Sequence, residues 1–305
     1  MNYVKCNLCG QDDWSVRFPA TLRPDNQPEV EAFRCTNAGY GHHPQIVECR
    51  HCGLVYANPR WPGGDLIAAY AAVEDETYVI ERAGRELTFS QHLQDMERVT
   101  GPANGRSLLD VGAYIGVFVE VARQNGWQAT GVEPSRWAAA VAQRQGLPVI
   151  LGTQTAPELQ GQQFDVITMW DVIEHVDDPA AEIRQAYQLL KPGGLLVIHT
   201  MDIDSLAARL MGRRWPWLMD MHIYYFSQAT LAKMLQQSGF TVIKSGAVGR
   251  YLRLGYLGTR VAGLSQLLGS LVTSLIKRLH LAEKPVRVNF GDLFTVYAQR
   301  PPASG

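Results

Sequence analysis

The chain has 305 residues, of which 46% are hydrophobic and 19% are charged, and its formal net charge is −1. Such a chain can bury a sizeable core, and its charge balance excludes a general attraction to polyanions. The residues after Met1 lack the apolar core of a signal peptide, and no stretch reaches the roughly 20 apolar residues that cross a bilayer. The sequence therefore predicts a globular cytoplasmic protein.

The N-terminal part contains two near-identical cysteine turns, at residues 6–10 (CNLCG) and 49–53 (CRHCG). Each turn offers two thiolates, and the glycine after the second cysteine tolerates the positive φ that such a turn needs. Four thiolates make a closed tetrahedral Zn²⁺ site with no position left for catalysis. A redox role is disfavoured because no βαβ pattern flanks the pairs. We predict a structural zinc ribbon over residues 1–60, with the ligands Cys6, Cys9, Cys49 and Cys52.

The segment between the ribbon and the first sheet strand is expected to be largely helical. A strand after the second cysteine turn stops at Pro59. Helices are predicted over 65–70 and 77–100, and His92 lies on a mixed face of the second, which could cover a cofactor or an acceptor. Residues 101–105 (GPANG) break the chain before the sheet begins.

From residue 107 onward, predicted strands and helices alternate. This alternation is typical of an α/β fold in which helices cover both faces of a mostly parallel, doubly wound sheet. The strands are expected near 107–111, 128–133, 147–151, 164–170, 194–200, 240–247 and 292–299. The helices are expected near 115–125, 135–145, 178–190 and 227–238.

A glycine turn follows the first of these strands. The strand ends at Asp110, and the chain then passes Gly112 and Gly116 before the helix starts. Such a turn lets a ligand approach bare backbone N–H groups at a helix N-terminus. The next strand ends at Glu133, and an acid at this place in a doubly wound sheet can bind both ribose hydroxyls of a nucleoside. These features point to a nucleoside cofactor.

Two further motifs follow in order, residues 171–176 (DVIEHV) after a buried strand and 191–194 (KPGG) before the next. Together with the glycine turn and Glu133 they resemble the class I S-adenosylmethionine-dependent methyltransferases, across roughly residues 75–300. The subgroup is similar to ubiquinone-pathway O-methyltransferases and to methyltransferases of glycan and natural-product pathways. The resemblance implies a seven-stranded Rossmann-like sheet of order 3-2-1-4-5-7-6 with the last strand antiparallel. This sequence departs from the family pattern at Tyr114, where many members carry a glycine.

The resemblance also implies where the cofactor binds. S-adenosylmethionine is expected in the crevice outside the strand ends, and Glu133 is expected to hold its ribose. The other expected cofactor contacts are Asp110, Gly112, Tyr114, Gly116, Pro134, Trp170 and Asp171. A phrase similar to the one after the second cysteine turn follows the zinc knuckle in the family, so the ribbon and the catalytic domain are expected to form one unit.

Three residues are candidates for acid–base chemistry. Methyl transfer requires the donor and acceptor to be aligned, water to be excluded and often a proton to be removed from the acceptor. Glu174 and His175 follow a strand end by one short turn, and either could face the acceptor. A similar cluster in the ubiquinone-pathway enzymes can hold a divalent metal, and a purely structural role is also open. His222 is a rival base, in the segment where the family builds its acceptor site.

Residues 221–282 contain no Asp or Glu and carry seven Lys or Arg. Within this run, leucines recur at helical spacing from Leu264 to Leu279, between the last two predicted strands. We expect a helical insertion near 250–283 in a hairpin that is usually short. The helix either docks on the domain or on a second subunit, or lies as a basic amphipathic helix on an anionic membrane.

The sequence as a whole predicts S-adenosylmethionine-dependent methyl transfer, with the methyltransferase domain over residues 75–300. The acceptor atom is expected to be an oxygen of a small molecule, a sugar or a lipid-linked glycan intermediate. One alternative is an RNA or protein methyltransferase whose ribbon grips the substrate, but the ribbon's Lys and Arg are balanced by Asp and Glu, so it offers no phosphate-tracking stripe. Another is a non-catalytic module that binds the cofactor. The location is then the cytoplasm, including the inner face of the membrane.

Overall fold

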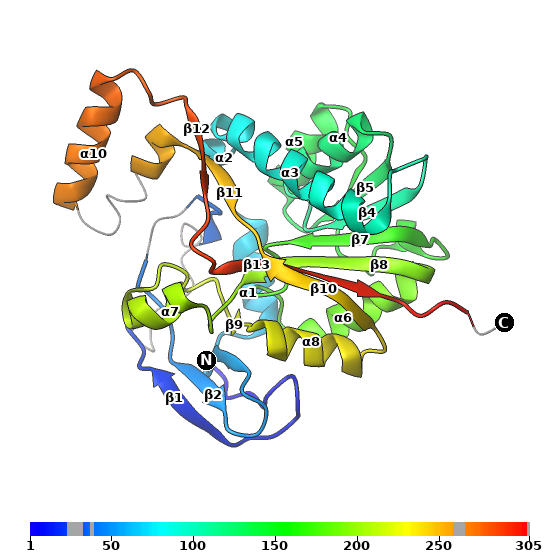
Figure 1. The fold of residues 1–305 in the computed structure, drawn as a ribbon. Coiled ribbons are helices and arrows are strands. Elements are labelled where there is room, and N and C mark those ends of the chain that lie inside the picture. Colours follow the sequence, from blue (N-terminus) through cyan, green and yellow to red (C-terminus); the bar gives the residue numbers. More distant parts are fainter. Residues whose placement is uncertain (23–32, 37–39, 259–265, 304–305) are drawn as a thin grey trace.

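The computed structural model describes residues 1–22, 33–36, 40–258 and 266–303. They form a central mixed sheet with helices on both faces, a smaller N-terminal sheet and an arm that extends from the last two strands of the central sheet (Figure 1). Among these residues, no helix combines the length and the apolar character needed to cross a bilayer.

The central sheet has seven strands in the order β10-β13-β8-β7-β4-β5-β6. Five neighbouring strands are parallel, and β13 is antiparallel to both β8 and β10. This is the expected order 3-2-1-4-5-7-6 with an antiparallel last strand, so that prediction is confirmed. The bounds are β4 Ser107–Val111, β5 Gln128–Glu133, β6 Val149–Leu151, β7 Phe164–Trp170, β8 Leu190–Met201, β10 Thr241–Ala247 and β13 Leu293–Gln299.

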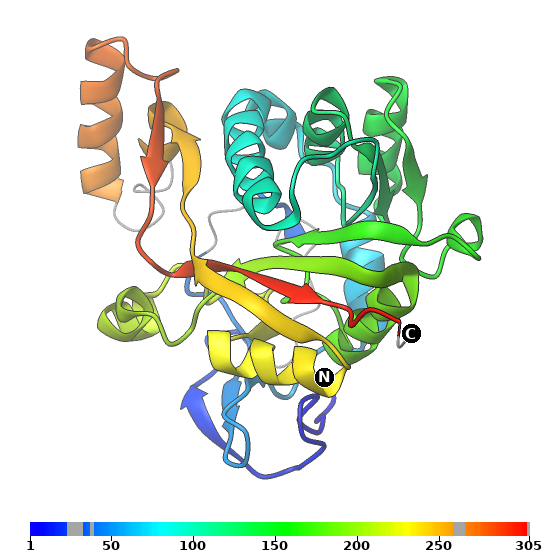
Figure 2. The ribbon, with the colours of Figure 1, turned by 45° about the vertical axis from the view of Figure 1, so that its right-hand side comes forward.

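Helices cover both faces of this sheet because its central strands are apolar on both sides. Both views place α3, α4 and α5 on one face and α6 and α8 on the other (Figures 1 and 2). One face of α4 is buried, including Phe118 and Val121. The bounds are α3 Arg82–Thr100, α4 Val117–Gln124, α5 Arg136–Arg144, α6 Pro179–Leu189 and α8 Gln228–Gln237, with a short 3-10 turn η2 at Pro157–Leu159.

The helical segment before the sheet differs from its prediction in one respect. The single helix predicted over 77–100 is two helices, α2 Glu76–Ile80 and α3, after the expected α1 Gly63–Ala71. Asp75 caps α2 by accepting a hydrogen bond from the backbone N–H of Tyr78. The chain leaves helical geometry at Glu81, whose carboxylate pairs with Arg253 of the distant arm. A tertiary ion pair therefore marks the break that local propensity did not reveal.

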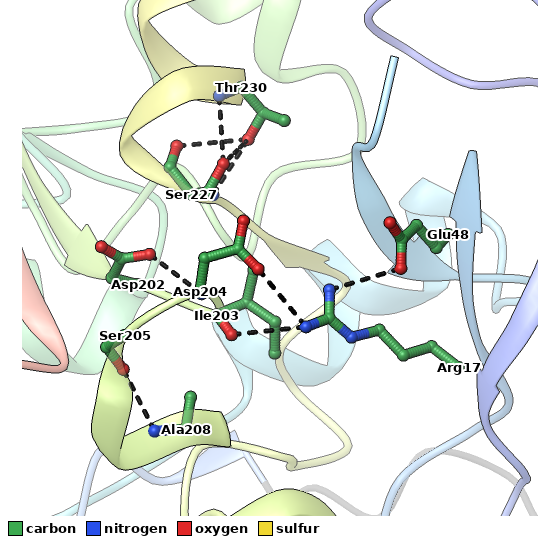
Figure 3. Close-up of polar contacts among 9 residues, drawn as sticks. All are labelled: Arg17, Glu48, Asp202, Ile203, Asp204, Ser205, Ala208, Ser227 and Thr230. Atoms are coloured by element: carbon green, nitrogen blue, oxygen red, sulfur yellow. Dashed lines mark hydrogen bonds and ion pairs between the residues drawn. The ribbon is translucent and has the colours of Figure 1, made fainter. Parts of the chain in front are cut away.

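The N-terminal sheet is built from two parts of the chain that are far apart in sequence. Its strands β1 Trp14–Phe18, β2 Ile46–Cys49 and β3 Val55–Ala57 pair in sequence, and β9 Tyr224–Tyr225 adds to β3. Figure 3 shows a further link, in which the Arg17 guanidinium lies 3.5 Å from Glu48 of β2 and 3.4 Å from Asp204, a residue that follows β8. The ribbon and the methyltransferase domain thus share a sheet, while the division at residues 60 and 75 stays a prediction.

The insertion between β10 and β13 is more than the helix that the sequence predicts. Its β11 Arg250–Arg253 pairs with β12 Pro285–Val288 in a two-stranded ladder, and α10 Gln266–Arg278 lies between them in sequence. The ladder was missed because its two short strands are far apart in the chain. We call residues 250–258 and 266–288 the arm. Leu264 and Arg260 lie outside the described residues. Outside the arm, the short helix α7 Leu206–Met211 follows β8 and continues into the 3-10 turn η3 Gly212–Arg214.

Candidate functional site

The four predicted metal ligands come together in the N-terminal sheet. The sulfur atoms of Cys6 and Cys52 lie 3.4 Å apart and those of Cys9 and Cys49 lie 3.5 Å apart, and all four lie within 4.8 Å of one another. None of these cysteines forms a disulfide. The turns have the expected form, since the glycines that follow have φ of 72° and 76°. Four thiols at this spacing are the donor set of a structural Zn²⁺, so the residues fit the ion.

The glycine turn is as tight as its sequence implies. Gly112 and Gly116 have φ of 70° and 78°. A Cβ on Gly112 would lie 2.6 Å from the side chain of Val172, and one on Gly116 would lie 2.8 Å from Leu147. Tyr114, where the family often has glycine, also has a positive φ of 49°. Its ring packs edge-on against Tyr78, with centroids 4.4 Å apart.

The two predicted carboxylates behind the turn are buried and hydrogen-bonded. Asp110 accepts a hydrogen bond from the Thr168 hydroxyl at 2.7 Å. Glu133 accepts hydrogen bonds from the backbone N–H groups of Tyr114, at 2.8 Å, and Ser135, at 2.7 Å. Burial raises the pKa of Asp110 to about 8 and that of Glu133 to about 7. Glu133 therefore organises the backbone of the turn, whereas Asp110 is held by a side chain of the neighbouring strand β7.

A cavity of about 640 Å³ opens beside the turn. Its lining includes eight of the residues predicted for the cofactor and the acceptor: Gly112, Tyr114, Pro134, Trp170, Asp171, Glu174, His175 and His222. Three predicted cofactor residues, Asp110, Gly116 and Glu133, do not line it. The cavity volume lies within the range of about 300–1,000 Å³ that is usual for small-molecule sites.

The three acid–base candidates meet at one end of the cavity. Ligand atoms of Glu174, His175 and His222 lie within 4.8 Å of one another. The Nδ1 atom of His175 lies 2.9 Å from the carbonyl oxygen of Met221, and that of His222 lies 2.7 Å from the carbonyl oxygen of Trp217. A carbonyl can only accept, so each Nδ1 carries the proton and each Nε2 is left with a free lone pair.

The environment decides how these groups are charged. Burial lowers the pKa of His175, and burial with the charge of His175 lowers that of His222 to about 3. Burial, with the charge of Asp171, raises the pKa of Glu174 to about 8. The Asp171 carboxylate stays charged, with a pKa lowered to about 2 against its burial, chiefly because the Arg250 guanidinium stabilises it. Near neutral pH the imidazoles are neutral and Glu174 is largely protonated.

Sequence reasoning missed two residues that complete this end of the cavity. The His199 Nε2 atom lies 3.9 Å from Asp171, and Arg250 of the arm lies 3.3 Å from the same carboxylate. The His92 ring, noted only as part of a mixed helix face, stacks on Trp170 with centroids 4.8 Å apart. His199 stands near the carboxyl end of a predicted sheet strand, a position that could have identified it. The position of Arg250 depends on the pairing of β11 with β12, and no local sequence pattern predicts it.

Several polar atoms in this region have no hydrogen-bond partner among the described residues. They are Nδ1 of His92, Nε1 of Trp170, Nε2 of His199 and both carboxylate oxygens of Glu174. Asp171, in their midst, adopts a left-handed φ of 53°. Unpaired buried polar atoms and a strained backbone are costly, and they concentrate where a protein binds ligands.

Comparisons with known proteins agree with this architecture. Residues 84–245 match the family model of a methyltransferase domain. The ubiquinone biosynthesis O-methyltransferase of Pseudomonas paraeruginosa is 38% identical over 111 residues, which cover 34% of this chain and 47% of that protein. The enzyme of the same name from Methylobacterium nodulans is 31% identical over 174 residues, covering 53% of this chain and 70% of that protein. The chain spans about half the length of the first of these relatives.

Solved structures show the same fold at low identity. A methyltransferase in complex with the Trm112 methyltransferase activator of Haloferax volcanii has a TM-score of 0.53 at 13% identity, covering 80% of this chain and all of that one. An S-adenosylmethionine-dependent methyltransferase from Archaeoglobus fulgidus has a TM-score of 0.50 at 17% identity, covering 74% of this chain and all of that one. With the family model matching more than half of its residues, the chain belongs to the class I S-adenosylmethionine-dependent methyltransferases.

Proposed function

We propose that this protein transfers the methyl group of S-adenosylmethionine to an oxygen of a small-molecule acceptor, with His175 removing the acceptor's proton. The observation that carries the proposal is a single cavity that joins the glycine turn to a cluster of neutral imidazoles. Bound S-adenosylmethionine would supply a methyl group already activated by its sulfonium. What remains for the chain is to hold both partners, exclude water and accept a proton.

The proposed cofactor position follows from the lining of the cavity. Gly112 and Tyr114 of the turn and Pro134 after β5 would contact the nucleoside and the methionine part. Glu133 does not line the cavity, so it would reach the ribose from behind the turn, through the lone pairs that its two backbone N–H contacts leave free. Trp170 would stand between this part and the acceptor. Asp110 and Gly116 would act through the shape of the turn.

His175 is the base that the surroundings favour. A general base works best when its pKa lies near the operating pH. His222 is too weak a base with a pKa near 3, and Glu174 is already largely protonated near neutral pH with a pKa near 8. For His175, the carbonyl of Met221 and the charge of Asp171 offset part of the effect of burial. Because Nδ1 of His175 donates to the carbonyl of Met221, its Nε2 has the lone pair that would take the proton.

The same three side chains also have the donor set of a divalent cation, so a second role is open to them. Two imidazoles with Nδ1 held by backbone carbonyls and one carboxylate without partners fit such an ion. A bound cation would supply Lewis-acid stabilisation of an acceptor oxygen. Elemental analysis separates the two roles: one zinc per chain supports His175 as a free base, and a second divalent ion that is lost in Glu174→Gln supports the metal.

An oxygen acceptor is supported by the names of the curated relatives, which are O-methyltransferases. Sugars and lipid-linked glycan intermediates also offer an oxygen as the acceptor atom, so the test includes them. The experiment incubates the purified protein with labelled S-adenosylmethionine and a panel of catechols, phenols, sugars and polyprenyl-linked sugars. Label should enter a member of the panel, and His175→Ala should slow the transfer by about 10²–10⁴-fold without loss of cofactor binding. Transfer that is equally fast in this variant would overturn the role of His175, and failure to bind the cofactor would overturn the function.

A further inference from the structure

The arm and α7 expose leucines on the surface, and this is unusual for a water-facing helix. In α10, Leu267, Leu271 and Leu275 are 73%, 62% and 58% exposed. They recur every four residues, and Leu279 continues the series just beyond the helix. In α7, Leu206 and Leu210 are 72% and 79% exposed. Single exposed leucines need no explanation, but an ordered series on two helices marks an interaction surface. We call these five residues with Leu279 the leucine surface.

The two helices belong to one side of the molecule. Both views place α7 and α10 on the same side, away from the C-terminus (Figures 1 and 2). The segment after α7 is fastened to the base of the arm, since the indole N–H groups of Trp215 and Trp217 donate to Asp292 at 3.1 and 2.9 Å. The Arg250 guanidinium lies 5.1 Å from the centre of the Trp217 ring. The segment that follows α7 is therefore held against the base of the arm.

The charges around the leucine surface are positive. α7 and η3 carry three exposed arginines, Arg209, Arg213 and Arg214. The arm adds four exposed cations, Lys277, Arg278, Lys284 and Arg287. Arg213, Arg214, Lys277 and Arg278 have no ion-pair partner within the described ranges. The acids that lie closest in sequence are engaged, because Glu283 pairs with Arg253 and Asp204 pairs with Arg17. A partner for this surface must therefore be apolar and negatively charged.

A second copy of the chain does not meet this requirement. A two-fold interface places the same patch of both copies in contact. Residues 221–282 contain no Asp or Glu, so the cations of one α10 would face those of the other. A bilayer of anionic lipid offers both the apolar interior and the negative headgroups. From the 13 residues of α10 we estimate a length of ~20 Å, less than the ~30 Å of a bilayer core, so the helix would lie in the plane of the interface.

We propose that the leucine surface docks the protein on an anionic membrane. The cavity reaches the same side, because Trp217 and Leu257 line it together with Phe290, which is 70% exposed. A docked chain would thus hold a rim of its cavity close to the lipid. Docking requires neither cofactor nor acceptor, so it can be tested apart from the proposed methyl transfer.

The test is co-sedimentation of the full chain with vesicles at low salt, without S-adenosylmethionine. Vesicles of phosphatidylcholine and phosphatidylglycerol in equal parts should bind the protein, and vesicles of phosphatidylcholine alone should not. Lys277→Glu should weaken binding by at least about fivefold, since each cation near an anionic surface contributes roughly that factor. Leu271→Gln should weaken it on the order of tenfold. Raising the salt concentration should release the protein.

Matched controls carry the same changes on the body of the domain. Lys233→Glu alters an exposed lysine of α8, and Ile243→Gln alters an exposed side chain of β10; both should bind like the unaltered protein. Melting temperatures of all four variants should agree, because every altered side chain is exposed. Equal recovery in the supernatant with and without phosphatidylglycerol would overturn the proposal. So would a dimer in light scattering that Leu271→Gln dissociates, since the surface would then be a subunit interface.

Discussion

The buried carboxylates at the two ends of the cavity differ in how they are satisfied. At the glycine turn, the carboxylates of Asp110 and Glu133 accept hydrogen bonds from Thr168 and from backbone N–H groups. At the acceptor end, the carboxylate of Glu174 and the Nε2 of His199 have no such partner among the described residues. Satisfied buried groups fix a shape, and unsatisfied ones are tolerated where a ligand completes them. Under the proposed function, this difference would correspond to a preformed cofactor end and an acceptor end that its ligand completes.

The largest expected effect comes from the zinc ribbon, whose sheet is joined to the acceptor end of the cavity. Its strand β3 pairs with β9, and the backbone N–H of Ile223, just before β9, donates to the carbonyl of Glu174. Structural zinc contributes on the order of 10 kcal/mol to folding in small domains. Cys6→Ser should therefore lower the melting temperature strongly, reduce zinc below one equivalent per chain and leave cofactor affinity nearly unchanged.

The matched control for this variant is Cys35→Ser, which changes the fifth cysteine, exposed and outside the cluster. It should keep one zinc per chain. Elemental analysis and thermal unfolding check both variants. Full zinc content in Cys6→Ser would contradict the four-cysteine site, and a large loss of cofactor affinity would contradict the separation between the two ends.

The next largest effect tests the acceptor end. His175→Ala should lower kcat by about 10²–10⁴-fold, the usual contribution of a general base, without changing the affinity for S-adenosylmethionine. His222→Ala should cost less, because the low pKa of His222 makes it the weaker base. Since the pKa of His175 is lowered, kcat/KM should rise with pH and level off below its ordinary value of about 6.5. A profile that levels off only above pH 7 would assign the proton to another group.

A smaller effect is expected at the cofactor end. Glu133→Ala should weaken S-adenosylmethionine binding by about 1.5–3 kcal/mol, the range for hydrogen bonds to a charged group. The variant loses the proposed ribose contact and the acceptor for the N–H groups of Tyr114 and Ser135. Glu133→Gln keeps the size and one acceptor oxygen, so its loss should be smaller. Calorimetry of both variants checks this, and unchanged affinity in Glu133→Ala would remove this residue from the ribose.

A last prediction concerns the dependence of stability on pH. The folded pKa of Asp110 is raised to about 8 by burial, against about 3.9 when unfolded. The folded state therefore holds this proton more tightly, and the contribution to stability is full below pH 4 and is lost as pH rises towards 8. Asp110→Asn should flatten the fall in unfolding free energy over this interval. Denaturant titrations at several pH values measure it, and an unchanged slope would contradict the raised pKa.

Much of the fold could be predicted from sequence because its signals are local. Local sequence predicts the backbone conformation in three places: the apolar runs of β4 and β7, the glycines at 112 and 116, and the paired cysteines. The pairing of β9 with β3 and the ladder of β11 with β12 could not be predicted, because each joins short segments far apart in the chain. The same holds for the site: Glu174 and His175 are one motif, whereas His199 and Arg250 meet Asp171 only through the tertiary fold.

The central claim is that one cavity holds the cofactor at the glycine turn and the acceptor at the imidazole cluster. A crystal structure of the protein with S-adenosylhomocysteine tests it most directly. The account predicts the adenosine beside Tyr114 and Pro134, the ribose at Glu133, and the sulfur directed past Trp170 towards His175. Density for the ligand outside this cavity, or a sulfur directed away from His175, would contradict the account.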